Sequence, residues 1–140
     1  MLRETTCERS AEEVPRYGKV LLLSTSPQRR AECARWLGAS GCASAYAYLR
    51  QALWDADETV RVCVVGAVGD LAVGQSGGEL AALYAWSGPR VRRAILMAVG
   101  RIGHLTAFDG LLGMAMKDPD RRVRVLAARA VANTARSAGG

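Results

Sequence analysis

Arginine recurs at regular spacing along the chain, and a row of guanidinium groups could do chemistry. Aligned segments begin at Arg29, Val60, Val91 and Val123, in steps of 31, 31 and 32 residues. The second position of every segment is arginine: Arg30, Arg61, Arg92 and Arg124. Guanidinium groups bind phosphate and carboxylate groups at two points, so the row could be a binding ladder. We favour a structural role, because a residue repeated in every unit serves what every unit needs, which is stacking.

The other arginines gather toward the C-terminus. Residues 1–88 hold nine basic and ten acidic residues, for a net charge of −1, whereas residues 89–140 hold ten and three, for +7. Such asymmetry favours an acidic partner, either a protein surface or a nucleic-acid backbone, although a solvated helix face explains part of it. The arginines concerned are Arg93, Arg101, Arg121, Arg122, Arg129 and Arg136.

A nucleic-acid partner is the less favoured of the two. Lysine occurs only at Lys19 and Lys117, and few aromatic residues stand between the basic ones. Phosphate tracking calls for denser basic grooves, and single-strand binding calls for aromatic platforms. We expect Trp36, Trp54 and Trp86 at core-like helix positions instead.

The remaining reactive residue types do not form a site. The four cysteines show no C-x-x-C pairing and the chain has one histidine, so we expect no metal site. His104 follows a glycine and is interpreted as a turn residue. An even number of cysteines could form disulfides, but without a secretion signal we favour reduced, buried thiols. No phosphate-binding loop occurs. We therefore expect no catalytic residue and no cofactor.

Each segment is expected to hold two helices. The second helix follows Ser26-Pro27, Asp57-Glu58, Gly88-Pro89 or Asp118-Pro119-Asp120, which are typical helix starts. The first helix begins about fifteen residues after each segment start, and Ser76 to Glu79 matches a capping box. Two rows of small residues allow close packing and left-handed helix ends. They are Gly38, Gly69, Gly100 and Ala132, and Gly41, Ala72, Gly103 and Ala135.

The pattern D-x-x-V-R-x-x-A-x-x-A-L-G-x-x-G resembles the short HEAT repeat of bacteria and archaea, including that of phycobilin lyases. Asp57 to Gly69, Val91 to Gly103 and Asp118 to Ala132 carry the resemblance, which covers roughly residues 26–136. The first segment departs from it with Arg29 in place of valine. The resemblance implies an all-α fold, a right-handed α-solenoid of about four stacked helical hairpins.

The resemblance also implies roles for residues. The repeated arginines Arg30, Arg61, Arg92 and Arg124 would form a structural ladder between repeats with the cap aspartates Asp57 and Asp120. Second helices line the concave side of such stacks. We therefore expect the partner-binding residues on that face to be Arg93, Arg101, Arg129, Asp70, Arg35 and Met97.

We thus predict a non-enzymatic scaffold or adaptor that binds an acidic surface of another protein. Nucleic-acid backbone binding through the basic C-terminal repeats, or a role as accessory subunit of a lyase-like enzyme, are the alternatives. The sequence leaves the oligomeric state open.

The predicted organisation is a single domain over residues 1–140. Residues 1–25 form an irregular cap whose helix starts near Arg16, residues 26–136 form the repeats, and residues 137–140 a frayed tail. No apolar run is long enough for a membrane helix, and residues 1–17 lack the apolar core of a signal peptide. We therefore expect a cytoplasmic protein.

Overall fold

The computed structural model describes residues 11–103 and 105–139, and the side chains within them except those of residues 105 and 134–139. This part of the chain is all-helical and contains no strand, which confirms the predicted all-α class. The chain divides into two compact units, Met1–Leu71 and Ala72–Gly140, called here the N-terminal and C-terminal units. His104, Cys7 and the side chain of Arg136 lie outside the described residues.

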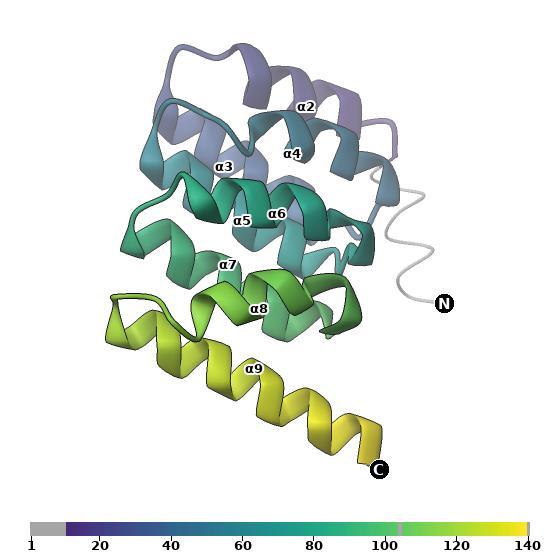
Figure 1. Ribbon diagram of the computed structural model, residues 1–140. Coiled ribbons are helices and arrows are strands. Elements are labelled where there is room, and N and C mark those ends of the chain that lie inside the picture. Colours follow the sequence, from purple (N-terminus) through teal and green to yellow (C-terminus); the bar gives the residue numbers. More distant parts are fainter. Residues whose placement is uncertain (1–10, 104, 140) are drawn as a thin grey trace. The chain divides into compact units, whose positions relative to one another are not determined.

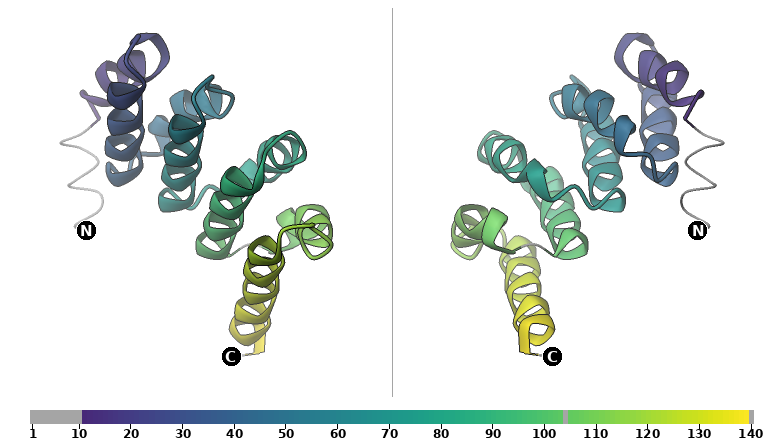
Figure 2. Two further views of the ribbon diagram at one scale, coloured as in Figure 1. Left: turned by 90° about the vertical axis from the view of Figure 1, so that its left-hand side faces the viewer. Right: turned by 90° about the vertical axis from the view of Figure 1, so that its right-hand side faces the viewer.

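Each unit packs its helices in two layers. In the N-terminal unit, α2 and α4 form one layer and α3 and α5 the other (Figure 1). In the C-terminal unit, α6 and α8 lie side by side, as do α7 and α9; Figure 2 shows these pairs from two sides. The helices are α2 (Val14–Leu23), α3 (Pro27–Ala39), α4 (Tyr46–Ala52), α5 (Glu58–Asp70), α6 (Gly77–Ala85), α7 (Pro89–Ile102), α8 (Asp109–Ala115) and α9 (Arg121–Gly139).

Apolar residues at helical spacing fill the space between the layers. In the N-terminal unit, Leu37, Leu49 and Val64 are fully buried. In the C-terminal unit, Leu80 and Ile95 are likewise fully buried between the layers. Because each pair of helices presents one apolar face, neither layer could bury its own side chains without the other.

Side-chain caps decide where the second helix of most hairpins begins. The Ser26 hydroxyl accepts a hydrogen bond from the backbone N–H of Arg29 at 3.3 Å. The carboxylates of Asp57 and Asp120 accept from the N–H groups of Val60 and Val123, both at 3.0 Å. These bonds satisfy N–H groups that have no partner within their own helix.

The capping box predicted at Ser76 does not form. The Ser76 hydroxyl donates to the carbonyl of Val73 at 2.6 Å and does not cap α6. A 3-10 turn, Gly74–Ser76, runs directly into α6, so Ser76 already has helical backbone angles when the helix begins. A capping side chain needs an extended backbone to reach the first turn, and Ser76 lacks it.

A residue with left-handed backbone angles follows the end of each of the helices α3, α5 and α7. Gly41, Ala72 and Gly103 have φ values of 69°, 52° and 78°, and they form one of the two rows of small residues. The equivalent residue in the last segment, Ala135, stays within α9. The helix continues to Gly139, further than the frayed tail from residue 137 that we expected, because Ser137 and Ala138 can extend a helix.

The first described helix, α2, also begins earlier than expected. It starts at Val14 rather than near Arg16, with Pro15 in its first turn, where the missing N–H costs nothing. Gly18 does not interrupt α2. A Cβ on Gly18 would lie 2.3 Å from the ring of Tyr48, so the glycine lets this ring from α4 pack against α2.

Candidate functional site

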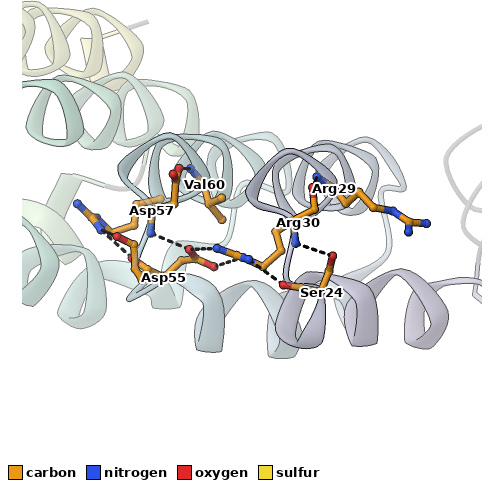
Figure 3. A network of polar contacts seen from close by, with 9 residues as sticks. Ser24, Arg29, Arg30, Asp55, Asp57 and Val60 are labelled. Carbon is orange, nitrogen blue, oxygen red and sulfur yellow. Dashed lines mark hydrogen bonds and ion pairs between the residues drawn. The ribbon is translucent and has the colours of Figure 1, made fainter.

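The loop before α5 is fastened by Arg30 from α3. Its Nε donates to Asp55 Oδ2 at 2.9 Å, and its Nη2 to Asp55 Oδ1 at 3.1 Å (Figure 3). Its Nη1 donates to the carbonyl of Ser24 at 2.7 Å, so one guanidinium joins two loops. The side chains of Arg30 and Asp55 are only 14% and 10% exposed. The hydrogen bond to Asp55 raises the pKa of Arg30, although burial opposes the shift.

The same loop is held from its other side. Arg61 Nη1 donates to the carbonyl oxygens of Asp55 and Ala56, at 2.7 and 3.2 Å. The carboxylate of Asp55 also accepts from the backbone N–H of Asp57 at 2.9 Å. Asp55 therefore organises the loop, and Asp57 is left to cap α5.

The C-terminal unit repeats this arrangement around Asp118, which is 4% exposed. Arg92 Nη1 donates to Asp118 Oδ2 at 2.8 Å, and the Tyr84 hydroxyl donates to the same oxygen. Arg92 also lies over the Tyr84 ring, 4.6 Å from its centroid. Arg124 Nη1 donates to the carbonyl of Asp118 at 2.7 Å, as Arg61 does to that of Asp55.

The environment of Asp118 favours its charged form. Burial by itself favours the neutral acid, but this effect is outweighed by the hydrogen bond from Tyr84, the backbone N–H of Asp120 and the charge of Arg92. Together they hold the pKa of Asp118 below its usual value. Burial, followed by the hydrogen bond to Asp118, raises the pKa of Tyr84 far above its usual value, so Tyr84 stays a proton donor.

These contacts correct the expected partners of the arginine row. The carboxylates that pair with it are Asp55 and Asp118, two residues before the predicted Asp57 and Asp120. The cap aspartates turn their carboxylates toward the first N–H groups of their own helices, which leaves the residue two positions earlier facing the arginine. The repeated D-x-D spacing was the signal in the sequence that could have identified this role.

Other arginines surround a surface hollow in the C-terminal unit, between α7 and α9. It measures about 470 Å³, and we call it the arginine hollow. Among the described residues, Arg121, Arg122 and Arg129 have no hydrogen-bond or ion-pair partner. Arg93 makes one long ion pair with Asp120, at 3.8 Å. The hollow is lined by Arg93, Arg121, Arg122, Val125, Leu126 and Arg129.

The structure brings only two of the six predicted partner-binding residues, Arg93 and Arg129, into this hollow. Met97 and Arg101 are exposed and follow Arg93 at four-residue spacing, so the three share one face of α7. Asp70 and Arg35 belong to the N-terminal unit, where both are exposed.

Arg35 lines a different hollow in the N-terminal unit. This hollow measures about 540 Å³, and its lining includes Glu32 and Asp57 as well as Arg35. It lies beside α3, and its mixed charges set it apart from the arginine hollow.

The sequence analysis named Arg121 and Arg122 among the basic residues but did not place them in the binding site, because their relation to Arg93 depends on how α9 packs on α7.

Two of the three tryptophans are exposed, which is contrary to the core-like positions expected for them. The exposed fractions are 53% for Trp54 and 84% for Trp86. Both stand in the turns that follow α4 and α6, where helical spacing no longer determines which side is buried. Trp36 is half-buried and stacks on Tyr17 with 3.9 Å between ring centroids.

The other residue types that could do chemistry are structural. Cys33 and Cys42 are buried and Cys63 is half-buried, all as free thiols, and burial raises the pKa of Cys33, which keeps it protonated. Among the described residues, no three His, Cys, Asp or Glu side chains gather as metal ligands would. Nor does this part of the chain contain a helix with the length and apolar character needed to cross a bilayer.

Comparison of the chain with models of known protein families found no match, and a search of curated proteins found none either.

Proposed function

We propose that the chain is a non-enzymatic cytoplasmic adaptor that binds an acidic surface of another protein through the arginine hollow. The observation that carries this proposal is a contrast between two sets of arginines. Those of the repeated row are committed to loops of their own unit, whereas Arg121, Arg122 and Arg129 have no partner among the described residues. Unpaired like charges gathered around one hollow repel one another, and an anionic partner relieves that repulsion.

The proposed scaffold is one HEAT-like domain over residues 1–140, a right-handed α-solenoid of about four helical hairpins. The support is local and repeats. Arg30, Arg61 and Arg124 each donate through Nη1 to the carbonyl six residues earlier, at 2.7 Å in all three cases. Such fastened hairpins present their side chains without an ordering cost at the moment of binding.

The floor of the hollow favours a protein partner over nucleic acid. Val125 is 41% exposed and lies between arginines, together with half-buried Leu126. Aliphatic side chains gain nothing from hydrated phosphates, but they are covered when an apolar residue of a protein partner packs on them. Among the side chains that the structure describes, no aromatic one lines this hollow to serve as a stacking platform for bases.

The test is capture of a partner by the whole chain from nuclease-treated extract. A double charge reversal, Arg93→Glu with Arg129→Glu, removes two cations from the hollow. Its matched control, Arg16→Glu with Lys19→Glu, makes the same change in charge on the exposed residues of α2 in the other unit.

We expect one stoichiometric protein to be captured by the wild type and the control and lost by the hollow variant, with unchanged helical circular dichroism. Equal capture by the two variants would show that the hollow is not the binding surface. A partner captured from untreated extract, lost in the hollow variant and absent from nuclease-treated extract, would assign the hollow to nucleic acid.

A further inference from the structure

One face of α9 lines the arginine hollow with residues in a regular pattern. Arg122, Val125, Leu126 and Arg129 stand at positions i, i+3, i+4 and i+7, so they form one stripe along the helix. The two arginines are about 10 Å apart along the helix axis, with the two aliphatic residues between them. The hollow therefore has a cation at each end and an apolar floor in the middle.

The two ends of the stripe differ in charge. Arg121 precedes Arg122, and Arg93 reaches the same end from α7, where its Nη1 lies 3.8 Å from Asp120 Oδ2. Three guanidinium groups thus gather near the start of α9, and Asp120 offsets only part of their charge. The other end has Arg129 alone among the residues that line the hollow.

A partner that covers this stripe must meet three requirements. It must place a carboxylate at each end, supply an apolar group between them, and keep the spacing of about 10 Å. A helix with acidic residues at i and i+7 and aliphatic residues at i+3 and i+4 meets all three, because it has the same rise per residue as α9. A carboxylate can pair with a guanidinium group through two hydrogen bonds, so binding is strongest in the register that places a carboxylate at each end.

We propose that the arginine hollow binds an amphipathic acidic helix of the partner with the pattern acid-x-x-aliphatic-aliphatic-x-x-acid. Any further acidic residue at one end of that helix places this end against Arg93, Arg121 and Arg122, which are three of the four arginines that line the hollow. This inference rests on the proposed function and deepens it, since it names the kind of segment that the partner presents.

The test uses a synthetic alanine-based peptide of about 16 residues, long enough to form a helix, that carries the pattern once. The two aliphatic residues of this peptide are leucines. A second peptide has the same composition, but its two leucines stand on the opposite face of the helix. A single-stranded DNA oligonucleotide is the third probe. Binding of each fluorescently labelled probe to the whole chain is measured by anisotropy, and circular dichroism checks the helicity of both peptides.

We expect the patterned peptide to bind at least about tenfold more tightly than its rearranged form, since only one of them covers the aliphatic floor. Arg129→Glu should weaken its binding about tenfold or more, and Arg16→Glu should not change it. Val125→Ser leaves every charge in place, so a loss of about fivefold with this variant identifies the apolar contact. Thermal unfolding of each variant verifies that it is folded.

Three results would overturn the inference: equal binding of the two peptides, no binding of either, or tighter binding of the oligonucleotide with no effect of Val125→Ser. The proposed function is decided separately by partner capture. Capture lost in the double charge reversal with no peptide bound would reject this helix pattern but leave the acidic partner supported. Peptide binding with capture unaffected by the reversal would support the pattern and reject the hollow as the adaptor surface.

Discussion

Arg30 and Asp55 form a two-point ion pair, with Nε 2.9 Å from Oδ2 and Nη2 3.1 Å from Oδ1. They stand 25 residues apart in the chain, on α3 and in the loop that precedes α5. Arg92 and Asp118 repeat the pairing in the C-terminal unit at one point, since Arg92 Nε donates instead to the carbonyl of Tyr84 at 3.0 Å. Arg30 and Arg92 therefore each fasten the loop that precedes the next second helix of their own unit.

We predict that Arg30→Lys destabilises the protein more than Arg61→Lys does. Lysine cannot donate at two points to Asp55 while also reaching the carbonyl of Ser24, so we expect a loss of about 1–2 kcal/mol in the free energy of unfolding. Arg61 donates only to carbonyl oxygens among the described residues, and the matched loss should be about 0.5 kcal/mol. Urea unfolding measures both, and equal losses would show that the ion pair contributes nothing extra.

The stability contributed by Asp118 should depend on pH. Its pKa is lowered in the folded state, so its contribution is fully present above the unfolded pKa of about 3.9 and is lost as the pH falls through the lower folded value. Asp118→Asn removes this titration. At pH 7 we expect the variant to be about 2 kcal/mol less stable than the wild type.

Unfolding of both proteins from pH 7 down to about 2.5 tests the direction of this effect. The difference in stability between wild type and Asp118→Asn should narrow below about pH 4, because the wild type alone loses the charged form of this side chain. Curves that stay parallel over the whole range would contradict the lowered pKa.

Gly38 is required by close packing of α3 on α5. A Cβ at this position would lie 2.7 Å from the Cα of Ala67, a backbone atom that cannot rotate away. We expect Gly38→Ala to cost about 1–3 kcal/mol. Gly100 belongs to the same row of small residues but would have nothing within 4 Å of a Cβ, so Gly100→Ala should stabilise α7 by about 0.5 kcal/mol.

Thermal or denaturant unfolding of the two glycine variants gives the comparison directly. We expect the two changes in the free energy of unfolding to have opposite signs. A purely conformational effect of glycine in a helix would instead stabilise both variants. Two stabilised variants would mean that α3 and α5 can separate enough to admit a methyl group.

Ala72 adopts a left-handed conformation, with φ of 52°. A side chain at this position is strained, so Ala72→Gly should raise the free energy of unfolding by about 0.5–1 kcal/mol. Gly103 has φ of 78° and nothing within 4 Å of an added Cβ, so Gly103→Ala should cost about 1 kcal/mol through backbone strain alone. Shifts of the unfolding midpoint in the same direction for both variants would refute the left-handed assignment of one position.

Local chemistry made the helices predictable from the sequence. The second helices start where Ser26, Asp57, Gly88 and Asp120 precede them, as the caps and prolines indicated. Prediction failed at Ser76, because a 3-10 turn that runs into α6 gives this residue helical backbone angles. It also failed for Trp54 and Trp86, which lie past the ends of their helices.

By itself, the sequence determined the all-helical class and the excess of arginine near the C-terminus. Caps, prolines and apolar spacing determine helices through contacts between residues close in the sequence, and the charge excess follows from counting residues. Only the tertiary structure decided that Asp55 and Asp118 pair with the arginine row, and that Arg93 joins Arg121, Arg122 and Arg129 around one hollow. Those relations join residues some 25 or more positions apart, and the packing of one helix on another sets their distances.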